Sequence, residues 1–145
     1  MKQVYDKIRQ KWVAATPEEI VRQRWTHRMV QELQYPPELL VIERELKMLP
    51  HLEKHPHPLP TRRVDILSFG KNRQGVFPLL LVECKSEPLT QEALDQAVAY
   101  NTFVQAFYVA IVNQTEVRLR YNLSCERCEI QHLPSFADLM EAVRE

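Results

Sequence analysis

The sequence predicts one α/β domain in which a mixed β-sheet is flanked by helices. The chain has 145 residues, which suits one hydrophobic core. Helical and strand-like patterns follow one another in the order α-β-β-β-α-β, and then come two short strands and a helix. The segment 107–114, FYVAIVNQ, is apolar over most of its length, as in a buried strand with a parallel neighbour. We therefore expect residues 1–145 to form a single domain.

The first predicted helix covers residues 17–34. Thr16 is a good N-cap, Pro17 suits the first helical position, and Glu19 completes a capping box. The sequence QYPPE ends the helix, since two prolines cannot continue it. The apolar stripe consists of Val21, Trp25, Met29 and Leu33. Trp12 also lies in a helical pattern, and we expect it, like Trp25, to pack in the core or between helices.

Three strands are predicted next, at 39–49, 62–69 and 76–85. The proline-rich sequence PHLEKHPHPLP separates the first two and reads as an irregular loop. The sequence GKNRQG, which holds both glycines of the chain, joins the other two. This arrangement predicts a β-hairpin over 62–85.

The second long helix is predicted over residues 90–105, where Thr90 is the N-cap and alanines and leucine supply the buried side. The apolar strand 107–114 follows. Two short strands at 116–123 and 128–133 and a helix within 134–145 complete the prediction.

Composition and charge narrow the class of protein. The apolar runs, such as Leu79–Val82 and Ala106–Val112, are far shorter than a membrane span, and the N-terminus has no apolar stretch typical of a secretory signal. Three cysteines, with Cys84 in a strand pattern, fit a reducing cytoplasm better than a disulfide framework. We therefore expect a cytoplasmic protein with no membrane contact.

The formal net charge is zero, which disfavours a protein that binds nucleic acid through charge alone. Lysines and arginines are nevertheless concentrated in residues 1–28 and 61–73. A basic face on a neutral protein is one interpretation, and a set of solvated surfaces is the simpler one.

One group of charged residues stands out at the end of the third strand. Glu83 and Lys85 share a face of that strand because side chains alternate with a period of two. Asp65 lies on the adjacent antiparallel strand of the predicted hairpin. We expect Asp65 and Glu83 to converge at the sheet edge.

Two carboxylates held close repel each other unless a cation lies between them. Mg²⁺ prefers oxygen ligands and often uses one or two carboxylates. A nearby lysine can orient or deprotonate a water, or stabilise charge on a phosphate. Asp65 with the Glu83-x-Lys85 pair is thus a candidate site for phosphodiester hydrolysis, although charged residues at the surface end of a strand are also common without any function.

The surrounding sequence resembles a known family. The segments PEEIVRQRW, LQYPPELLVIERELK, RVDIL, LLVECK, LTQEALDQAVAYN and FYVAIVN resemble the PD-(D/E)XK nuclease superfamily, and more closely the N-terminal nuclease domain of type I restriction enzyme R subunits. The resemblance covers roughly residues 16–121. It implies a restriction-endonuclease-like fold and a metal-dependent endonuclease that hydrolyses DNA.

The resemblance also implies roles for individual residues. Asp65 and Glu83 would bind Mg²⁺ or Mn²⁺, with the main-chain carbonyl of Cys84 as a third ligand, and Lys85 would be the catalytic lysine. Two helical residues, Gln96 and Tyr100, match a Gln-x-x-x-Tyr motif that is also found in some archaeal resolvases. They are four residues apart and share a helix face.

The family also places a glutamate on the first helix. We prefer Glu18, which shares the inward stripe, over Glu19, which has the capping box as an alternative role. The family's proline before the first acid is replaced here by Val64. R subunits continue into a helicase-like motor, whereas this chain ends at residue 145. We accordingly expect a nuclease domain that acts alone, is part of a larger protein, or works with a helicase, translocase or other restriction subunit.

Alternatives from other classes stay open at this point. The fold could serve as a non-catalytic module that binds DNA or a protein. Cys125-x-x-Cys128 with His132 nearby suggests zinc, but a surface turn between two strands is the preferred interpretation. Three histidines in the proline-rich loop suggest either a transition-metal cluster or, preferably, a solvated loop: His51, His55 and His57. Cutting two DNA strands takes two sites, so a homodimer is compatible with the proposed activity.

Overall fold

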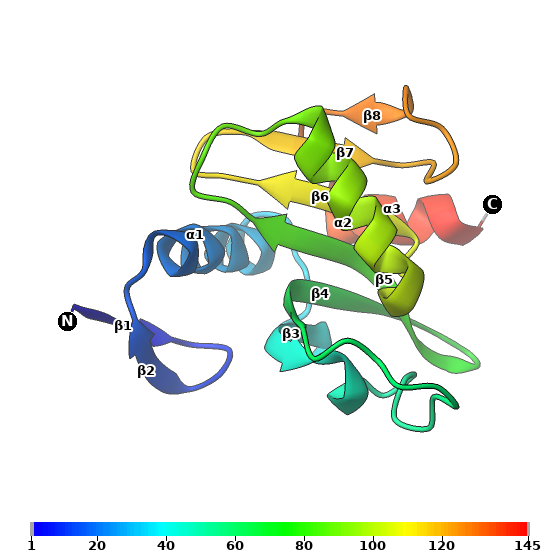
Figure 1. Ribbon diagram of the computed structural model, residues 1–145, viewed down its shortest axis with the longest axis horizontal. Coiled ribbons are helices and arrows are strands. Elements are labelled where there is room, and N and C mark those ends of the chain that lie inside the picture. The colour runs from blue at the N-terminus through cyan, green and yellow to red at the C-terminus, as the bar shows by residue number, and fades with distance from the viewer. Residues whose placement is uncertain (1, 145) are drawn as a thin grey trace.

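The computed structural model describes residues 2–144, which form three α-helices and two β-sheets (Figure 1). The helices are α1 (Pro17–Gln31), α2 (Gln91–Val104) and α3 (Phe136–Arg144). The small sheet pairs β1 (Gln3–Asp6) with β2 (Lys11–Ala14). The strands of the large sheet are β3 (Leu40–Glu45), β4 (Arg63–Asn72), β5 (Gly75–Cys84), β6 (Tyr108–Val112), β7 (Val117–Arg120) and β8 (Glu129–Ile130).

The large sheet has its six strands in chain order from β3 to β8, and the pair β5–β6 is parallel while the others are antiparallel. The predicted α/β fold class is therefore confirmed, as are the order of the elements from α1 onward and the β4–β5 hairpin. The parallel pair is the one that the apolar segment 107–114 predicted. The connection from β5 to β6 runs through α2, as a parallel crossover requires.

Three differences from the predicted elements have physical causes. Strand β3 ends at Glu45, earlier than predicted, because a 3₁₀ turn over Leu46–Met48 follows it. The hairpin β1–β2 was not predicted at all. Trp12 was expected in a core and is 64% exposed on β2, where its ring contacts Tyr5 edge to face.

The helices cover both faces of the large sheet. One hydrophobic cluster joins α1 and α3 to β5 residues such as Leu80 and Val82. A second cluster joins α2 to the opposite face, through Leu81 and its neighbours. Figure 1 shows α2 lying across the front of the sheet, with α1 and α3 to its sides. Side chains along β5 therefore pack against a hydrophobic layer on each face of the sheet, with Leu80 and Val82 on one face and Leu81 on the other.

Helix α1 is fixed at its N-terminus and at its middle by specific contacts. Thr16 Oγ1 accepts a hydrogen bond from the Glu19 amide at 3.1 Å, which confirms the predicted N-cap. Trp25 is buried, and its indole Nε1 donates to the Asn113 carbonyl at 2.6 Å, just beyond β6. The helix ends at Gln31, three residues before the predicted end. These contacts fix the position of α1 relative to the ends of β4 and β5.

The β4–β5 hairpin is irregular near its middle. Its register shifts between Ser68 and Phe69, and Phe69 lies opposite Pro78. A bulge at this point accommodates the proline, which has no N–H to donate to the ladder. Beyond the bulge, pairing is regular toward Val82, so the strand ends beside α1 are well defined.

Other predicted features have clear positions. Cys125 and Cys128 lie in the turn between β7 and β8, where the Cys128 amide donates to the Cys125 carbonyl at 3.2 Å. His51 differs from the expected solvated loop, because its ring packs edge to face on Phe69 and its Nε2 lies 2.6 Å from the Val104 carbonyl oxygen. None of the helices within residues 2–144 is long and apolar enough to cross a membrane.

Candidate active site

The predicted convergence of Asp65 and Glu83 follows from the register of β4 and β5. Ile66 pairs with Val82, so Asp65 and Glu83 occupy the next position along the two strands. The Cys84 amide donates to Asp65 Oδ2 at 2.9 Å, which holds the Asp65 carboxylate against the end of β5. Glu83 is 3% exposed, and no donor from the described residues reaches its Oε1. An unpaired, buried carboxylate oxygen is costly unless another group completes it.

The two carboxyl groups have opposite pKa shifts. Burial opposes ionisation of Asp65, but hydrogen bonds from Glu83, Arg22 and the Cys84 amide outweigh it and lower the Asp65 pKa. Burial and the neighbouring Asp65 carboxylate raise the Glu83 pKa well above its ordinary value, against the weaker effects of nearby cations. Glu83 thus readily shares a proton with Asp65.

Cys84 and Lys85 follow Glu83 directly at the end of β5. Lys85 is half-buried, and its amide donates to the Val112 carbonyl at 2.8 Å, so its backbone is fixed by β6. The Cys84 thiol lies in the hydrophobic cluster beneath α1, and burial raises its pKa well above the ordinary value. The thiol is therefore neutral, and the main chain is the part of Cys84 suited to ligation.

Helix α2 brings Tyr100 but not Gln96 to the carboxylates. Tyr100 is buried, and burial followed by the Glu83 charge raises its pKa to about 12. The Arg62 guanidinium lies 4.1 Å from the centre of the Tyr100 ring, and its Nη2 is 3.6 Å from Glu83 Oε2. Gln96, one turn earlier, is exposed and its Nε2 lies 3.5 Å from Glu92 Oε1.

The two candidate acids on α1 point to different partners. Glu18 is exposed, and its Oε1 accepts from Ser86 Oγ at 3.3 Å, directly after Lys85. Glu19 is 5% exposed and accepts from Arg9 Nη2 at 2.6 Å and from Arg22 Nη1 at 2.7 Å. The expectation that Glu18 shares the inward stripe of α1 is therefore wrong: Glu18 is exposed and faces the loop beyond β5, whereas Glu19 is the buried acid and is part of an ionic network.

Arg22 is the centre of that network, and the sequence reasoning did not identify it. Its Nη2 donates to Asp65 Oδ1 at 2.7 Å and lies 2.8 Å from Glu43 Oε1, while its Nη1 contacts Glu19. Its side chain is 6% exposed. The signal in the sequence was an arginine next to Val21 on the inward side of α1, where a buried charge needs a partner.

Glu43 is a second residue that the sequence reasoning missed. It lies on β3 between Ile42 and Arg44, whose partners on β4 flank Asp65, and its φ is +50°. A non-glycine residue in this left-handed region is strained. The irregular backbone brings the Glu43 carboxylate toward Arg22, so that three strands and α1 contribute charges to one place.

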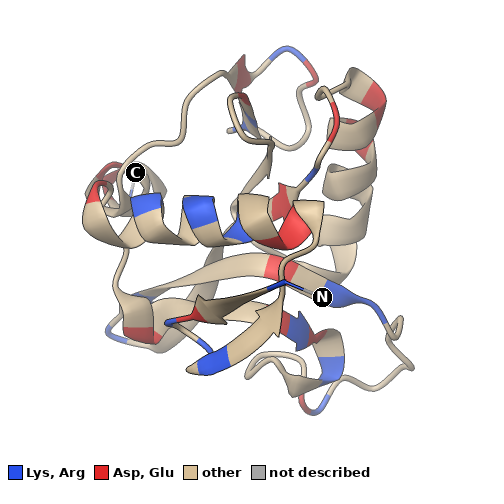
Figure 2. Cartoon of the chain, turned by 90° about the vertical axis from the view of Figure 1, so that its left-hand side faces the viewer, with Lys and Arg blue, Asp and Glu red and all other residues tan. Residues whose placement is uncertain are grey.

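Figure 2 shows acidic and basic positions intermingled where the first turn of α1 meets the ends of the strands. A family model described as "Type I restriction enzyme R protein N terminus (HSDR_N)" matches residues 17–136, from the start of α1 to the start of α3. The chain belongs to this family. A comparison with curated proteins finds no match.

The matched region of this R-protein N-terminal domain includes every predicted site residue, whereas the β1–β2 hairpin precedes it. That hairpin nevertheless contacts the ionic network beside the candidate site of the domain. Arg9, in the β1–β2 turn, pairs with both Asp6 and Glu19, and Glu19 pairs with Arg22. The N-terminal residues outside the family match therefore support the same ionic network.

The family resemblance implies a divalent metal, and the donor set of this R-protein N-terminal domain fits one. Asp65 and Glu83 offer carboxylate oxygens side by side, and Glu83 Oε1 is the unpaired oxygen noted above. No group of three or more His, Cys, Asp or Glu residues arranged for a metal ion occurs between residues 2 and 144. Two carboxylates suffice for Mg²⁺, which keeps several waters.

Proposed function

We propose that this chain is a metal-dependent endonuclease domain that hydrolyses DNA phosphodiester bonds in the cytoplasm as part of a restriction system. One observation carries the proposal. Asp65 and Glu83 meet at the buried ends of β4 and β5 with Glu83 Oε1 unpaired, and Lys85 follows two residues later. Membership of the restriction R-protein family supports the same activity.

The roles of the residues follow from their positions. Asp65, Glu83 and the Cys84 carbonyl would hold Mg²⁺ or Mn²⁺, which supplies Lewis-acid activation and neutralises charge on phosphate when bound. Lys85 positions the attacking water and stabilises the charge that builds on the phosphate oxygens. Its backbone is fixed by β6, and its charge is close enough to lower the pKa of Glu83 against the effect of burial.

Three further residues complete the proposed site. The Tyr100 hydroxyl, which has no partner among residues 2–144, would donate to the phosphate or accept a hydrogen bond from Lys85. Gln96 is exposed on the same helix and is free to turn toward bound DNA. Glu18, beside Ser86, completes the metal environment, directly or through water.

DNA would approach across the basic side chains beside the site. Arg62 and Arg63 are 49% and 56% exposed, and both lie at the start of β4 next to Asp65. Cations at this position can pair with the phosphate groups of the DNA backbone. A helicase, translocase or other restriction subunit, or a second copy of this chain, would supply the movement along DNA or the second cut.

A non-catalytic DNA-binding or protein-interaction module is the second candidate function, and one observation favours it. Arg22 already pairs with Asp65 Oδ1 at 2.7 Å, so this carboxylate has a cationic partner without any metal. A domain that has lost catalysis would keep this ion pair for its fold. Activity, rather than DNA binding, therefore separates the two candidates.

The test is cleavage of supercoiled plasmid and of single-stranded DNA in Mg²⁺ or Mn²⁺, by the wild type and by Asp65→Asn and Lys85→Ala. Lys71→Ala is the control, because Lys71 is exposed near the tip of the β4–β5 hairpin, at the other end of these strands. We expect cleavage by the wild type and the control, and a loss of at least about 100-fold in both site variants. DNA binding without cleavage by the wild type would favour the second candidate.

A further inference from the structure

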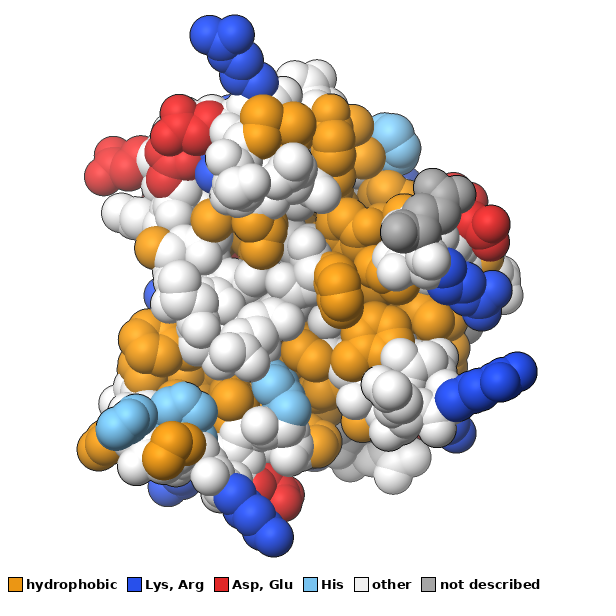
Figure 3. All heavy atoms as spheres, turned by 90° about the vertical axis from the view of Figure 1, so that its right-hand side faces the viewer, with side chains coloured by type: hydrophobic (Ala, Val, Ile, Leu, Met, Phe, Trp, Pro, Cys, Tyr) orange, Lys and Arg blue, Asp and Glu red, His pale blue; other side chains and the backbone are white. Residues whose placement is uncertain are grey.

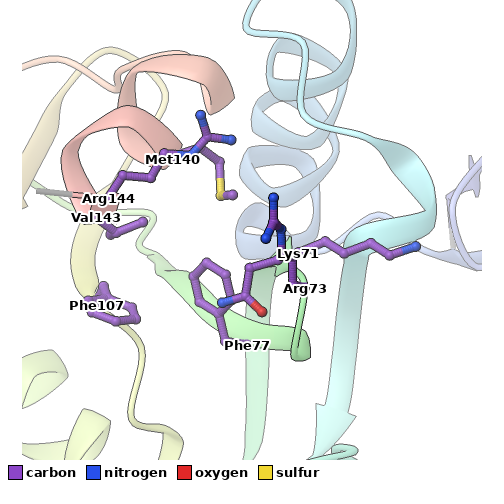
Figure 4. Close-up of a pocket in the computed structure, with 8 residues that line it drawn as sticks. Lys71, Arg73, Phe77, Phe107, Met140, Val143 and Arg144 are labelled. Atoms are coloured by element: carbon purple, nitrogen blue, oxygen red, sulfur yellow. The ribbon is translucent and has the colours of Figure 1, made fainter.

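The end of the sheet away from the candidate active site carries a groove of about 570 Å³ (Figure 4). The tip of the β4–β5 hairpin forms one side, and α3 forms the other. Its apolar lining comes from Phe77 on β5, Phe107 before β6, and Met140 and Val143 on α3. This volume lies within the range of sites that bind other molecules.

The base of the groove is well packed. Phe77 and Phe107 meet edge to face, with ring centres 5.6 Å apart. Phe77 and Met140 both lie over Gly70, where an added Cβ would come within 2.5 Å of Phe77 Cζ and 2.7 Å of Met140 Sδ. The absence of a side chain at Gly70 lets the two side chains approach β4, so the groove has a preformed apolar base.

The apolar surface continues out of the groove. Phe107 is 53% exposed, which is unusual for a large apolar side chain beside a preformed hollow. Figure 3 shows hydrophobic side chains gathered across this face, with lysines and arginines projecting at its edges. An exposed aromatic at the centre of such a surface is typical of a protein-binding site.

The charged residues around the groove are basic. Lys71 and Arg73 stand on the hairpin side and Arg144 on the α3 side, and no aspartate or glutamate within residues 2–144 lines the hollow. Glu141 lines only the neighbouring hollow, together with Lys71 and Arg144. The ion pairs of the described residues include neither Lys71 nor Arg73. These cations therefore have no acidic partner in this part of the chain.

We propose that this groove binds an acidic amphipathic helix of a partner protein. Apolar side chains on one face of that helix would fill the space between Phe107, Phe77 and Met140. Glutamates or aspartates on its flanks would pair with Lys71, Arg73 and Arg144, which the groove presents on both sides. The positive charge of the rim and the apolar base together favour this kind of partner.

Single-stranded nucleic acid fits the same rim less well. Bases bind by stacking on open aromatic faces. Phe77 is covered by Phe107 and Met140, so among the residues that line the groove only Phe107 presents an exposed aromatic ring, whereas Met140 and Val143 suit leucine-like side chains better. Phe77 is also six positions from Glu83 along β5, about 20 Å away, so a helix here leaves the candidate active site open to DNA. Binding of a helix in this groove does not depend on nuclease activity.

A displayed library of helical peptides, each about four turns long, provides the probe. The peptides carry randomised surface positions and are selected on the folded chain, and the enriched peptides are measured by fluorescence anisotropy. Three variants of exposed groove residues test the site: Phe107→Ser, Lys71→Glu and Arg73→Glu. Trp12→Ser and Lys54→Glu are matched controls, since both residues are exposed elsewhere.

We expect the enriched peptides to combine apolar anchors with glutamate or aspartate. Phe107→Ser should weaken them by roughly tenfold or more, as for a central aromatic anchor. Each charge reversal should weaken them several-fold, with a smaller effect at high salt, and the controls should bind like the wild type. Enrichment of neutral or basic peptides, no enrichment, or equal binding to the groove variants would overturn the proposal. Tighter binding of a single-stranded oligonucleotide that the same variants abolish would also overturn it.

Discussion

Arg22→Gln removes the guanidinium that links Asp65, Glu43 and Glu19, and its consequences can be worked out from the contacts. Arg22 is buried with a side chain 6% exposed, and it contacts the three carboxylates at 2.7–2.8 Å. Removing one partner from a buried ionic group typically destabilises a protein by about 3–5 kcal/mol, because the remaining charges are left unpaired. Glutamine keeps most of the side-chain volume, so the charge is the main loss.

Part of the loss is compensated by other contacts. Glu19 keeps Arg9 at 2.6 Å, and Asp65 keeps the Cys84 amide at 2.9 Å. We therefore expect the lower end of the range, about 3 kcal/mol of unfolding free energy. For a chain of this length, that lowers the melting temperature by about 6–12 °C.

The same substitution should strengthen metal binding. A cation that binds Asp65 must displace the Arg22 hydrogen bond at Oδ1, and a charge-assisted hydrogen bond contributes about 1.5–3 kcal/mol. Without that competitor, Mg²⁺ or Mn²⁺ should bind about ten- to hundredfold more tightly. Saturating metal should then restore part of the stability lost in Arg22→Gln.

Chemical denaturation and isothermal titration calorimetry measure both effects. Arg28→Gln is the control, because Arg28 lies on the same helix in an exposed ion pair with Glu32 and should contribute less than about 1 kcal/mol. If Arg22→Gln is as stable as Arg28→Gln, or if it binds metal no more tightly than the wild type, the proposed competition at Asp65 is wrong.

Three further predictions concern individual residues. Because the Glu83 pKa is raised in the folded protein, the free energy of unfolding of the wild type should fall as the pH rises from about 4.5 through that raised pKa. Glu83→Gln should remove this dependence and should be the more stable protein at pH values above the raised pKa. Urea denaturation measured across pH tests this, and identical pH profiles for the two proteins would show that the shift is absent. Tyr100→Phe should change the unfolding free energy by less than about 1 kcal/mol, since the hydroxyl has no partner within residues 2–144, yet slow DNA cleavage; unchanged cleavage by the variant would contradict the role given to Tyr100. Trp25→Phe removes the hydrogen bond to the Asn113 carbonyl and part of a buried ring, so thermal denaturation should show a loss of about 1–3 kcal/mol of unfolding free energy. Unchanged stability would contradict the role of Trp25 in holding α1 on the sheet.

Much of the fold was predictable because its signals are local. The capping residues Thr16 and Thr90, the two glycines around the hairpin turn, and the apolar segment before Asn113 each specify one element. The hairpin β1–β2 was missed since lysine, arginine and tryptophan there follow no clear period of two. Its stability comes instead from tertiary ion pairs, which a sequence pattern does not display.

The candidate site was predictable to the extent that it follows from strand pairing. The β4–β5 register alone brings Asp65 and Glu83 together, and Lys85 follows from the alternation along β5. Arg22 and Glu43 were not predictable in the same way. Arg22 reaches Asp65 across 43 positions of sequence, and Glu43 depends on a left-handed backbone conformation that its residue type does not favour.

The most direct test of the central claim is Mn²⁺ binding, measured by electron paramagnetic resonance on the wild type, Glu83→Gln and Glu45→Gln. Glu45 is the control, because it is a partly exposed strand acid paired with Arg63 and Lys47. Our account predicts one bound Mn²⁺ per chain, affinity reduced about tenfold or more in Glu83→Gln, and wild-type affinity in the control. Wild-type protein that binds no Mn²⁺, or Glu83→Gln that binds it equally well, would contradict a metal-dependent site at the ends of β4 and β5.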